Sequence, residues 1–368
     1  MLETLPYIVF AVVVLMMMAL DLGVFNRHAR RLSLKEATAW SCAWIGLALS
    51  FNVGLYFWGT ARGLGSQAAL EFFTGYIIEY SLSVDNIFVF VLIFSYFGVP
   101  SEYQHKILFW GILGALVMRA AFITTGVVLV RHFHWVFYVF GAFLIFTGIK
   151  MGQHEETEVH PERNVFIRLC HRIFPITPNY EGSKFFIKKS DKLFATPLFL
   201  VLVMVETTDL VFALDSIPAI FAITQNPFII YSSNVFAILG LRSLYFVLDG
   251  FIDKFRFLKL GLSFVLSFIG LKMLSPLILS GLTSVFTFVG MSDLLPETFD
   301  IPVQYSLIVI LSILAISILA SLVPERKTAN EADYEQMPNF GPNARELLNT
   351  ETSNRNKVRN KTGNSSGK

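Results

Sequence analysis

The sequence predicts an all-α, polytopic membrane protein with about nine transmembrane helices. Of its 368 residues, 54% are hydrophobic and only 15% are charged, and the mean hydropathy is +0.59. A helix of about 20 apolar residues spans the hydrocarbon core of a bilayer, and this chain contains many such runs. Its two cysteines, Cys42 and Cys170, form neither a disulfide framework nor a CxxC motif. This composition excludes an ordinary soluble domain.

Hydrophobic runs define the expected spans and the segments between them. The nine helices are expected at 5–25, 36–59, 70–97, 105–130, 134–152, 195–223, 228–252, 256–279 and 302–323. They form a transmembrane domain over residues 1–323, with a loop at 153–194 and a polar tail at 324–368 that is expected to be disordered. No cleavage site follows the first run, so we expect that helix to be retained.

Basic residues outside the expected spans favour one orientation. With the N-terminus outside, the inner loops and the tail carry nearly all of them, and the outer loops hold only Arg62 and Arg131. Loops rich in Lys and Arg remain in the cytoplasm. We therefore expect an outer N-terminus and a cytoplasmic C-terminus.

Two segments fit this scheme less simply. Pro276–Gly290 is too short for a comfortable span, and we expect it to be re-entrant or interfacial on the outer side. Glu162–Phe174 is amphipathic, which suits a helix on an anionic membrane surface or, equally, one packed on the protein. Its apolar side holds Val165, Phe166, Leu169 and Ile173.

Two of the expected spans contain matching acidic motifs, EYSLSVDN from Glu79 and DLVFALDS from Asp209. In each motif an acid is followed six residues later by an aspartate, then by an amide or hydroxyl side chain and an isoleucine. A carboxylate at the bilayer centre costs about 2.5–3.5 kcal/mol on insertion scales. These acids therefore require compensation, and a metal cation in transit would provide it.

Basic residues repeat in the same order as the acids. Arg119 follows the first motif as Arg242 follows the second, and Lys150 in FTGIKM matches Lys272 in FIGLKM. These landmarks predict two three-helix repeats, about 70–152 and 195–275, and the odd number of spans makes the second repeat inverted. Inverted repeats of this kind place a substrate site near the midplane of the membrane.

The charges within the expected spans do not balance. Mutual pairing, with one acid to each base, would leave two acids over, and one divalent cation would neutralise them. Asp21 has an alternative, because it can pair with Arg27 or Arg30 instead. The candidate metal ligands are Glu79, Asp85, Asn86, Glu206, Asp209, Asp215, Ser216 and Asp21, and the candidate charge partners are Arg119, Arg242, Lys150 and Lys272.

Helical geometry restricts which acids can share an ion. Residues six apart, such as Glu79 and Asp85, are about 9 Å apart and turned by about 120°, so they share an ion only if the helix is interrupted. Pro218 removes the hydrogen bond to the carbonyl of Leu214 and could provide such a break. We expect the site to draw Asp85, Asn86, Asp209 and Asp215 from two facing helices.

The ligand types indicate a hard cation. Carboxylate, amide and hydroxyl oxygens suit Mn²⁺, Mg²⁺ or Ca²⁺. All seven histidines fall in loops or at helix ends, and neither cysteine is near an acidic motif, which disfavours zinc and copper. We expect no permanently bound cofactor and no nucleic-acid partner.

At EYSLSVDNIFVF, GALVMRAAF, VETTDLVFALDSIPAIFAIT and NVFAILGLRSLYF, the chain resembles the TerC/Alx family of integral membrane proteins over about residues 5–323. The resemblance implies manganese export across the bacterial inner membrane and a historical association with tellurium (tellurite) resistance. It also implies a transport role for Glu79, Asp85, Glu206, Asp209 and Asp215. The segment Pro276–Asp300 and the polar tail depart from the family pattern.

The leading hypothesis is a secondary transporter that exports Mn²⁺ or a similar cation, coupled to protons. The alternative is a membrane-protein assembly or metal-loading factor without its own transport activity, which would bind other membrane proteins or a second copy of the chain. The chain has no GxGD motif, which disfavours an intramembrane aspartyl protease, and no P-loop for ATP. We expect no enzymatic activity.

Overall fold

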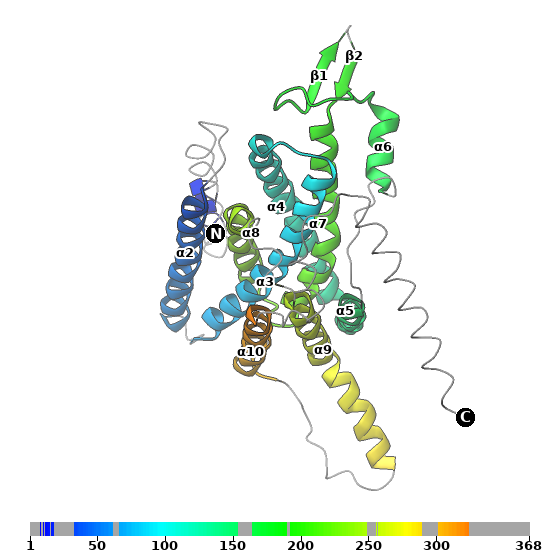
Figure 1. Ribbon diagram of the computed structural model, residues 1–368. Helices are drawn as coiled ribbons and strands as arrows, with labels where there is room; N and C mark the ends of the chain where they lie inside the picture. The colour runs from blue at the N-terminus through cyan, green and yellow to red at the C-terminus, as the bar shows by residue number, and fades with distance from the viewer. Residues whose placement is uncertain are drawn as a thin grey trace, which may run out of the picture. The chain divides into compact units, whose positions relative to one another are not determined.

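The computed structural model describes residues 8, 10, 12–14, 16–17, 33–61, 66–153, 164–189, 192–248, 255, 257–288 and 301–323. Eight helices in these ranges are long and apolar enough to span a membrane, which confirms a polytopic, mainly helical fold. Of the expected first helix, the described positions are helical, and Asp21 lies outside the described residues. The eight helices are α2 (Leu34–Ala61), α3 (Gln67–Tyr96), α4 (Ser101–His132), α5 (Trp135–Gln153), α7 (Pro197–Phe221), α8 (Pro227–Leu248), α9 (Leu258–Phe288) and α10 (Val303–Leu322) (Figure 1).

Helix starts follow the positions of proline. Pro197 and Pro227 begin α7 and α8, and Pro100 and Pro302 immediately precede α4 and α10. Proline suits a helix start because its fixed φ is already helical and its missing N–H would be unpaired there anyway. The sharp turn between α3 and α4 uses Gly98 at φ +58°, a conformation that side-chain-bearing residues rarely adopt.

Helices of the two predicted repeats pack against each other. α3 packs on α8, α4 on α7, and α5 on α9, and α3 also contacts α7. Exchanging α3, α4 and α5 for α7, α8 and α9 leaves this set of pairs unchanged. The inverted repeat stays a prediction, and this pattern is the one that two related repeats would give.

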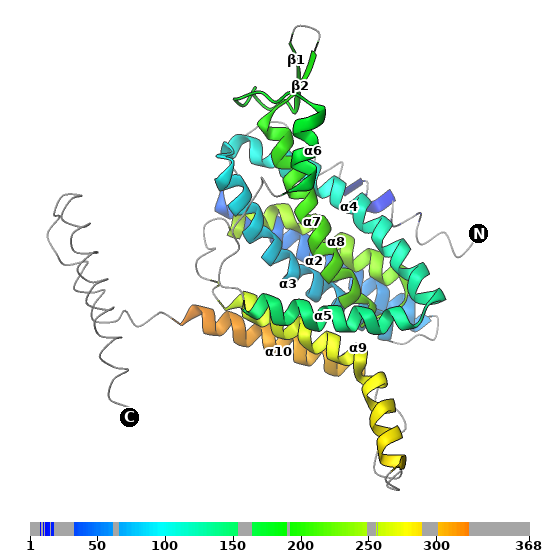
Figure 2. The same ribbon diagram turned by 90° about the vertical axis from the view of Figure 1, so that its right-hand side faces the viewer.

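Helices α5 and α9 lie side by side (Figure 2), and single residues between them follow the same exchange. A Cβ added to Gly270 would lie 2.6 Å from the carbonyl oxygen of Gly141, and one added to Gly148 would lie 2.8 Å from that of Ser263. In the aligned motifs Gly148 matches Gly270, and Gly141 matches Ser263. The two close approaches are therefore the same contact made in both directions.

The described part of Pro276–Gly290 is not separate from the preceding span, because α9 continues through Pro276 to Phe288 (Figures 1 and 2). Its re-entrant or interfacial place in the membrane stays a prediction. Proline removes the N–H that would bond to the carbonyl of Lys272. The hydroxyl of Ser275 donates to that carbonyl instead, at 2.8 Å, so the helix proceeds with its acceptor satisfied.

The predicted loop 153–194 contains a helix, α6 (Val165–Ile173), and a hairpin that the sequence analysis missed. Strands β1 (Phe186–Lys189) and β2 (Lys192–Ala195) pair antiparallel, with Phe186 opposite Ala195. Tyr180, between α6 and β1, donates from its hydroxyl to the carbonyl of Phe97 at 2.8 Å, which ties this segment to the α3–α4 turn.

Helix α6 lies beside the first turns of α7 (Figure 1). Its N-cap Asn164 contacts the sulfur of Met204, and Phe174 at its other end packs edge-on against Phe199. Ile167 is buried, whereas the predicted apolar side is exposed: Val165, Phe166, Leu169 and Ile173. One face of α6 therefore packs on the protein, as one interpretation expected, whereas contact of its exposed apolar face with a membrane surface stays a prediction.

Candidate functional site

A single arginine joins the two acidic motifs inside the helical bundle. Arg119 lies on the buried face of α4, in step with Ala115 and Ile123. Its Nη1 is 2.5 Å from Oε2 of Glu79 on α3, and its Nη2 is 3.3 Å from Oδ1 of Asp209 on α7. The three side chains are 3%, 0% and 4% exposed, respectively.

Arg119 makes two further contacts with α7. Nε lies 3.4 Å from Oδ2 of Asp209, so the guanidinium faces both oxygens of that carboxylate. Nη1 also donates to the hydroxyl of Ser216 at 3.2 Å. The fork of the guanidinium therefore connects α4 to both acid-bearing helices.

The charges of this cluster do not cancel. One guanidinium faces two carboxylates, so the cluster carries one negative charge when both acids are ionised. One acid to each base, the pairing considered from the sequence, is not the arrangement at Glu79 and Asp209, which share Arg119. Buried charge of this kind is costly unless it is compensated.

Buried oxygens near the cluster have no partner within the described part of the chain. They are Oε1 of Glu79, Oγ of Ser83 and Oε2 of Glu206. Ser83 lies one turn after Glu79 on α3, and Glu206 lies one turn before Asp209 on α7, so each is on the same side of its helix as the cluster acid. Buried polar atoms normally bind a protein group, a water or an ion.

Glu206 lies directly against the backbone of α4. A Cβ added to Gly114 would fall 1.9 Å from Oε1 and 2.4 Å from Cδ of Glu206, so only glycine leaves room for the carboxylate in this position. Gly114 is therefore a residue of the candidate site that sequence reasoning missed. Its only signal was a glycine in an otherwise apolar stretch of the arginine-bearing helix.

The second acids of the motifs form a separate pair. Asp215 on α7 faces Thr147 of α5 and lies near enough to Asp85 and Lys150 to experience their charges. Asp85 in turn experiences the charge of Lys259 on α9. Both aspartates are half-buried, as expected for residues turned away from the buried side of α3 and α7. Each acid thus lies near its counterpart from the other predicted repeat.

The remaining predicted residues are distributed around these two groups. Asn86 on α3 and Arg242 on α8 are buried, at 2% and 5% exposure. Lys272 donates to the hydroxyl of Ser306 on α10 at 3.1 Å, and Lys150 is exposed on α5. The structure therefore brings Glu79, Asp209 and Ser216 together around Arg119, and Asp85 near Asp215.

The expected convergence of Asp85, Asn86, Asp209 and Asp215 on one ion is not seen. Among the described residues, no three His, Cys, Asp or Glu side chains are grouped so that they could hold a metal ion. The guanidinium of Arg119 occupies the space between the nearest acids of the two helices. The expected helix break is also wrong, because α7 runs unbroken through Pro218 and α3 is continuous.

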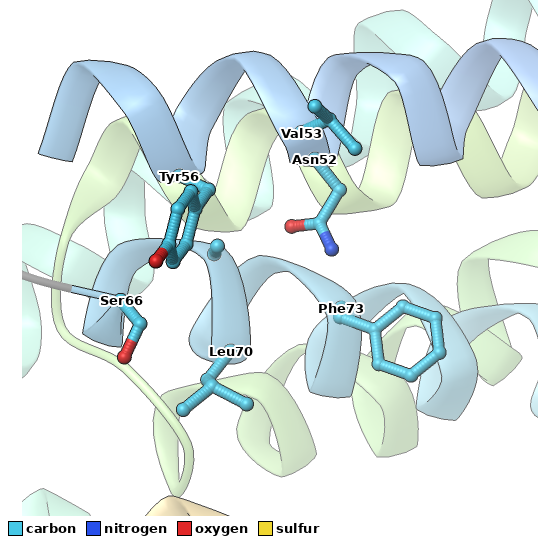
Figure 3. A pocket seen from close by; sticks show the side chains of 7 residues that line it. Asn52, Val53, Tyr56, Ser66, Leu70 and Phe73 are labelled. Atoms are coloured by element: carbon cyan, nitrogen blue, oxygen red, sulfur yellow. The ribbon is translucent and has the colours of Figure 1, made fainter. Parts of the chain in front are cut away.

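A groove between α2 and α3 lies apart from the acids. It is lined by Asn52, Val53 and Tyr56 of α2 and by Ser66, Ala69, Leu70 and Phe73 at the start of α3 (Figure 3). None of these side chains is charged, so the groove offers a cation no compensating charge.

Comparison with known proteins identifies the family of this chain. Residues 64–329 match the model of the integral membrane protein TerC family. The chain belongs to the TerC family. The match begins just before α3 and extends past the end of α10, so the TerC region contains both acidic motifs and Arg119, whereas α2 lies outside it.

Several TerC relatives cover most of the chain. An "Uncharacterized membrane protein STKORF319" of Myxococcus xanthus is 48% identical over 86% of this chain and 92% of its own length. The "Putative membrane-bound redox modulator Alx" of Escherichia coli K12 is 46% identical over 72% of this chain and 84% of its own. The protein of the same name from Photorhabdus laumondii is 40% identical over 88% of this chain and 96% of its own length. No solved structure matches the chain.

Proposed function

We propose that this TerC-family protein is a secondary transporter that exports a divalent metal cation, Mn²⁺ first among them, across the bacterial inner membrane. The orientation is that favoured by loop charge, with the N-terminus outside and the C-terminus in the cytoplasm. The observation that carries the proposal is the pair of buried acids from two helices that share one arginine, Arg119. Such a pair retains negative charge in a place where only a cation can neutralise it.

The atoms around Arg119 suit a hard divalent ion. When the guanidinium withdraws, Glu79 and Asp209 offer carboxylate oxygens, Ser83 and Ser216 offer hydroxyls, and Glu206 adds a third carboxylate. Oxygen ligands of this kind favour Mn²⁺, Mg²⁺ and Ca²⁺. The Asp85–Asp215 pair, on the same two helices, provides a second place for the ion along its path.

Coupling to protons follows from the same groups. A carboxylate binds either a proton or a metal ion. Protons that enter the site from the outside therefore displace the metal ion, which leaves to the outside. Such exchange requires no bound cofactor and no ATP, which agrees with the absence of a P-loop from the sequence.

Flux into vesicles tests the proposal. Purified protein in liposomes should take up radiolabelled Mn²⁺ under an imposed proton gradient, and uptake by Asp85→Asn and Asp215→Asn should fall at least about tenfold because a carboxylate ligand is lost. Glu181→Gln is the matched control, since Glu181 pairs with Lys189 outside the spans with both side chains well exposed.

The alternative of an assembly or metal-loading factor makes a different prediction. Wild-type protein that folds, binds Mn²⁺ and co-purifies with other membrane proteins, but moves no Mn²⁺ into liposomes, would overturn the transport proposal. Equal uptake by the wild type and both aspartate variants would overturn the assigned pathway.

A further inference from the structure

The two predicted repeats carry an arginine at matching positions, Arg119 and Arg242. Arg119 lies on α4, which packs against α7, and Arg242 lies on α8, which packs against α3. Each arginine is therefore on a helix that lies beside the acid-bearing helix of the other repeat. Both side chains are buried in the bundle.

Exchanging the repeats maps the observed contacts onto a second set. Arg119 contacts Glu79, Asp209 and Ser216. Position by position, the motifs align Glu79 with Asp209 and Ser216 with Asn86. The exchanged arrangement is therefore Arg242 bound to Asp209, Glu79 and Asn86. The two acids are the same in both arrangements, and Asn86 is buried and carries an amide oxygen to replace the hydroxyl.

We propose that Arg119 and Arg242 alternate as tethered counter-cations of one acid pair, Glu79 and Asp209. Arg119 holds the acids in the arrangement described here, and Arg242 holds them in the arrangement that opens to the other side. The metal ion takes the place of either arginine. This inference rests on the proposed transport function and on the inverted repeat.

The physical reason lies in the return step of the cycle. A transporter that has released its ion must reverse its orientation with the site empty. Two uncompensated carboxylates inside a membrane protein oppose that step, because a buried charge without a partner is strongly destabilising. An arginine already attached to a neighbouring helix compensates one of the two acids, and the proton that displaced the metal compensates the other. Inverted repeats alternate by exchanging the conformations of their halves, so each half requires its own arginine.

The proposal separates net transport from exchange. Net flux requires the empty site to return, whereas exchange of Mn²⁺ for Mn²⁺ uses the metal-loaded site in both directions. Arg119→Gln and Arg242→Gln should each reduce net uptake at least about tenfold because the empty acids lose their counter-charge. The same variants should still exchange external radiolabelled Mn²⁺ for unlabelled Mn²⁺ inside the liposomes. Arginines needed only for folding would reduce both modes equally.

The experiment compares the two modes in proteoliposomes with Mn²⁺ alone as the probe. Arg131→Gln is the matched control, because Arg131 is exposed at the far end of α4 and should leave both modes unchanged. Arg119→Lys and Arg242→Lys retain the charge and should recover part of the net flux, although lysine cannot form the two-pronged contact.

Three outcomes overturn the inference or its basis, and each is distinct. Wild-type protein without flux in either mode refutes the proposed transport function. Equal loss of net flux and exchange in both glutamine variants refutes the counter-cation role. Loss of net flux in Arg119→Gln but not in Arg242→Gln refutes alternation.

Milder variants keep the test valid if removal of an arginine prevents folding. Ser216→Ala and Asn86→Ala each remove one neutral contact to an arginine, the first observed and the second inferred. Both should slow net flux about two- to tenfold and slow exchange by a smaller factor, because each removes one neutral oxygen donor and leaves every carboxylate and both arginines in place. An effect of Ser216→Ala alone contradicts the exchanged arrangement.

Discussion

The α3–α7 and α5–α9 contacts both join the two predicted repeats, yet one depends on buried charged side chains and the other on small neutral residues. α5 and α9 meet closely through glycine and serine, with a hydrogen bond from the Ser263 hydroxyl to the Gly148 carbonyl. α3 and α7 are connected through Arg119, with two buried acids and several oxygens that lack partners in the described chain. Close backbone packing is typical of a structural membrane contact, whereas buried charge is typical of a functional one.

The largest effect should come from breaking the charged contact. Arg119→Met leaves two buried carboxylates without their partner, which should cost about 3–5 kcal/mol of unfolding free energy. Thermal unfolding in detergent measures the loss. Adding Glu79→Gln and Asp209→Asn to the same variant should restore most of it, and Mn²⁺ should raise the Tm of Arg119→Met more than that of the wild type. No recovery on neutralising the acids would contradict the charge argument.

The neutral contact should respond to size rather than charge. Gly270→Ala places a methyl group against the carbonyl of Gly141, and overpacking of this kind costs about 1–3 kcal/mol. Gly46→Ala on α2 is the control, because a Cβ there meets nothing within 4 Å and alanine favours a helix by about 1 kcal/mol. A lower Tm for Gly46→Ala than for Gly270→Ala would show that α5–α9 is not closely packed.

A smaller effect should separate stability from function near Glu206. The methyl group of Gly114→Ala displaces only the end of a flexible carboxylate. The free energy of unfolding, followed through the Tm, should therefore change by less than about 1 kcal/mol. Mn²⁺ affinity, followed by titration of the purified protein, should fall because Glu206 is turned away from Asp209. Unchanged affinity would remove Glu206 from the cation site.

A similarly small effect concerns Pro276 within α9. Ser275→Ala removes the hydroxyl that replaces the missing proline donor, which should cost about 1 kcal/mol. Ser280→Ala, which removes an ordinary bond to the carbonyl of Leu277, should cost less. Equal Tm shifts for the two variants would indicate that the Lys272 carbonyl does not depend on Ser275.

The sequence predicted features within single helices well and contacts between helices poorly. Hydropathy located the spans because a long apolar run is by itself sufficient to predict a transmembrane helix. The matching acidic motifs identified α3 and α7 as partners. The sequence could not show that Glu79 and Asp209 share Arg119, because counting charges does not say which helix lies beside which. Gly114 was missed for the same reason, since the glutamate that it accommodates is on another helix.

Two errors had local causes. The hairpin at β1 and β2 is short, and its flanking apolar and lysine residues looked like an ordinary charged loop. The α9 extension was missed because Pro276–Gly290 was judged by its length as a span of its own, whereas the helix continues through Pro276 with the preceding serine bonded to the Lys272 carbonyl.

The mutual contact of Gly141 with Gly270 and of Gly148 with Ser263 has a mechanical consequence. Under the proposed exchange of the two halves these two close approaches map onto each other and can persist, whereas the hydrogen bond from the Ser263 hydroxyl to the Gly148 carbonyl has no counterpart at Gly141. The axis about which the two halves would rotate can therefore pass through the α5–α9 contact. A chemical staple placed there should be tolerated during turnover, whereas a staple between α4 and α7 should stop it.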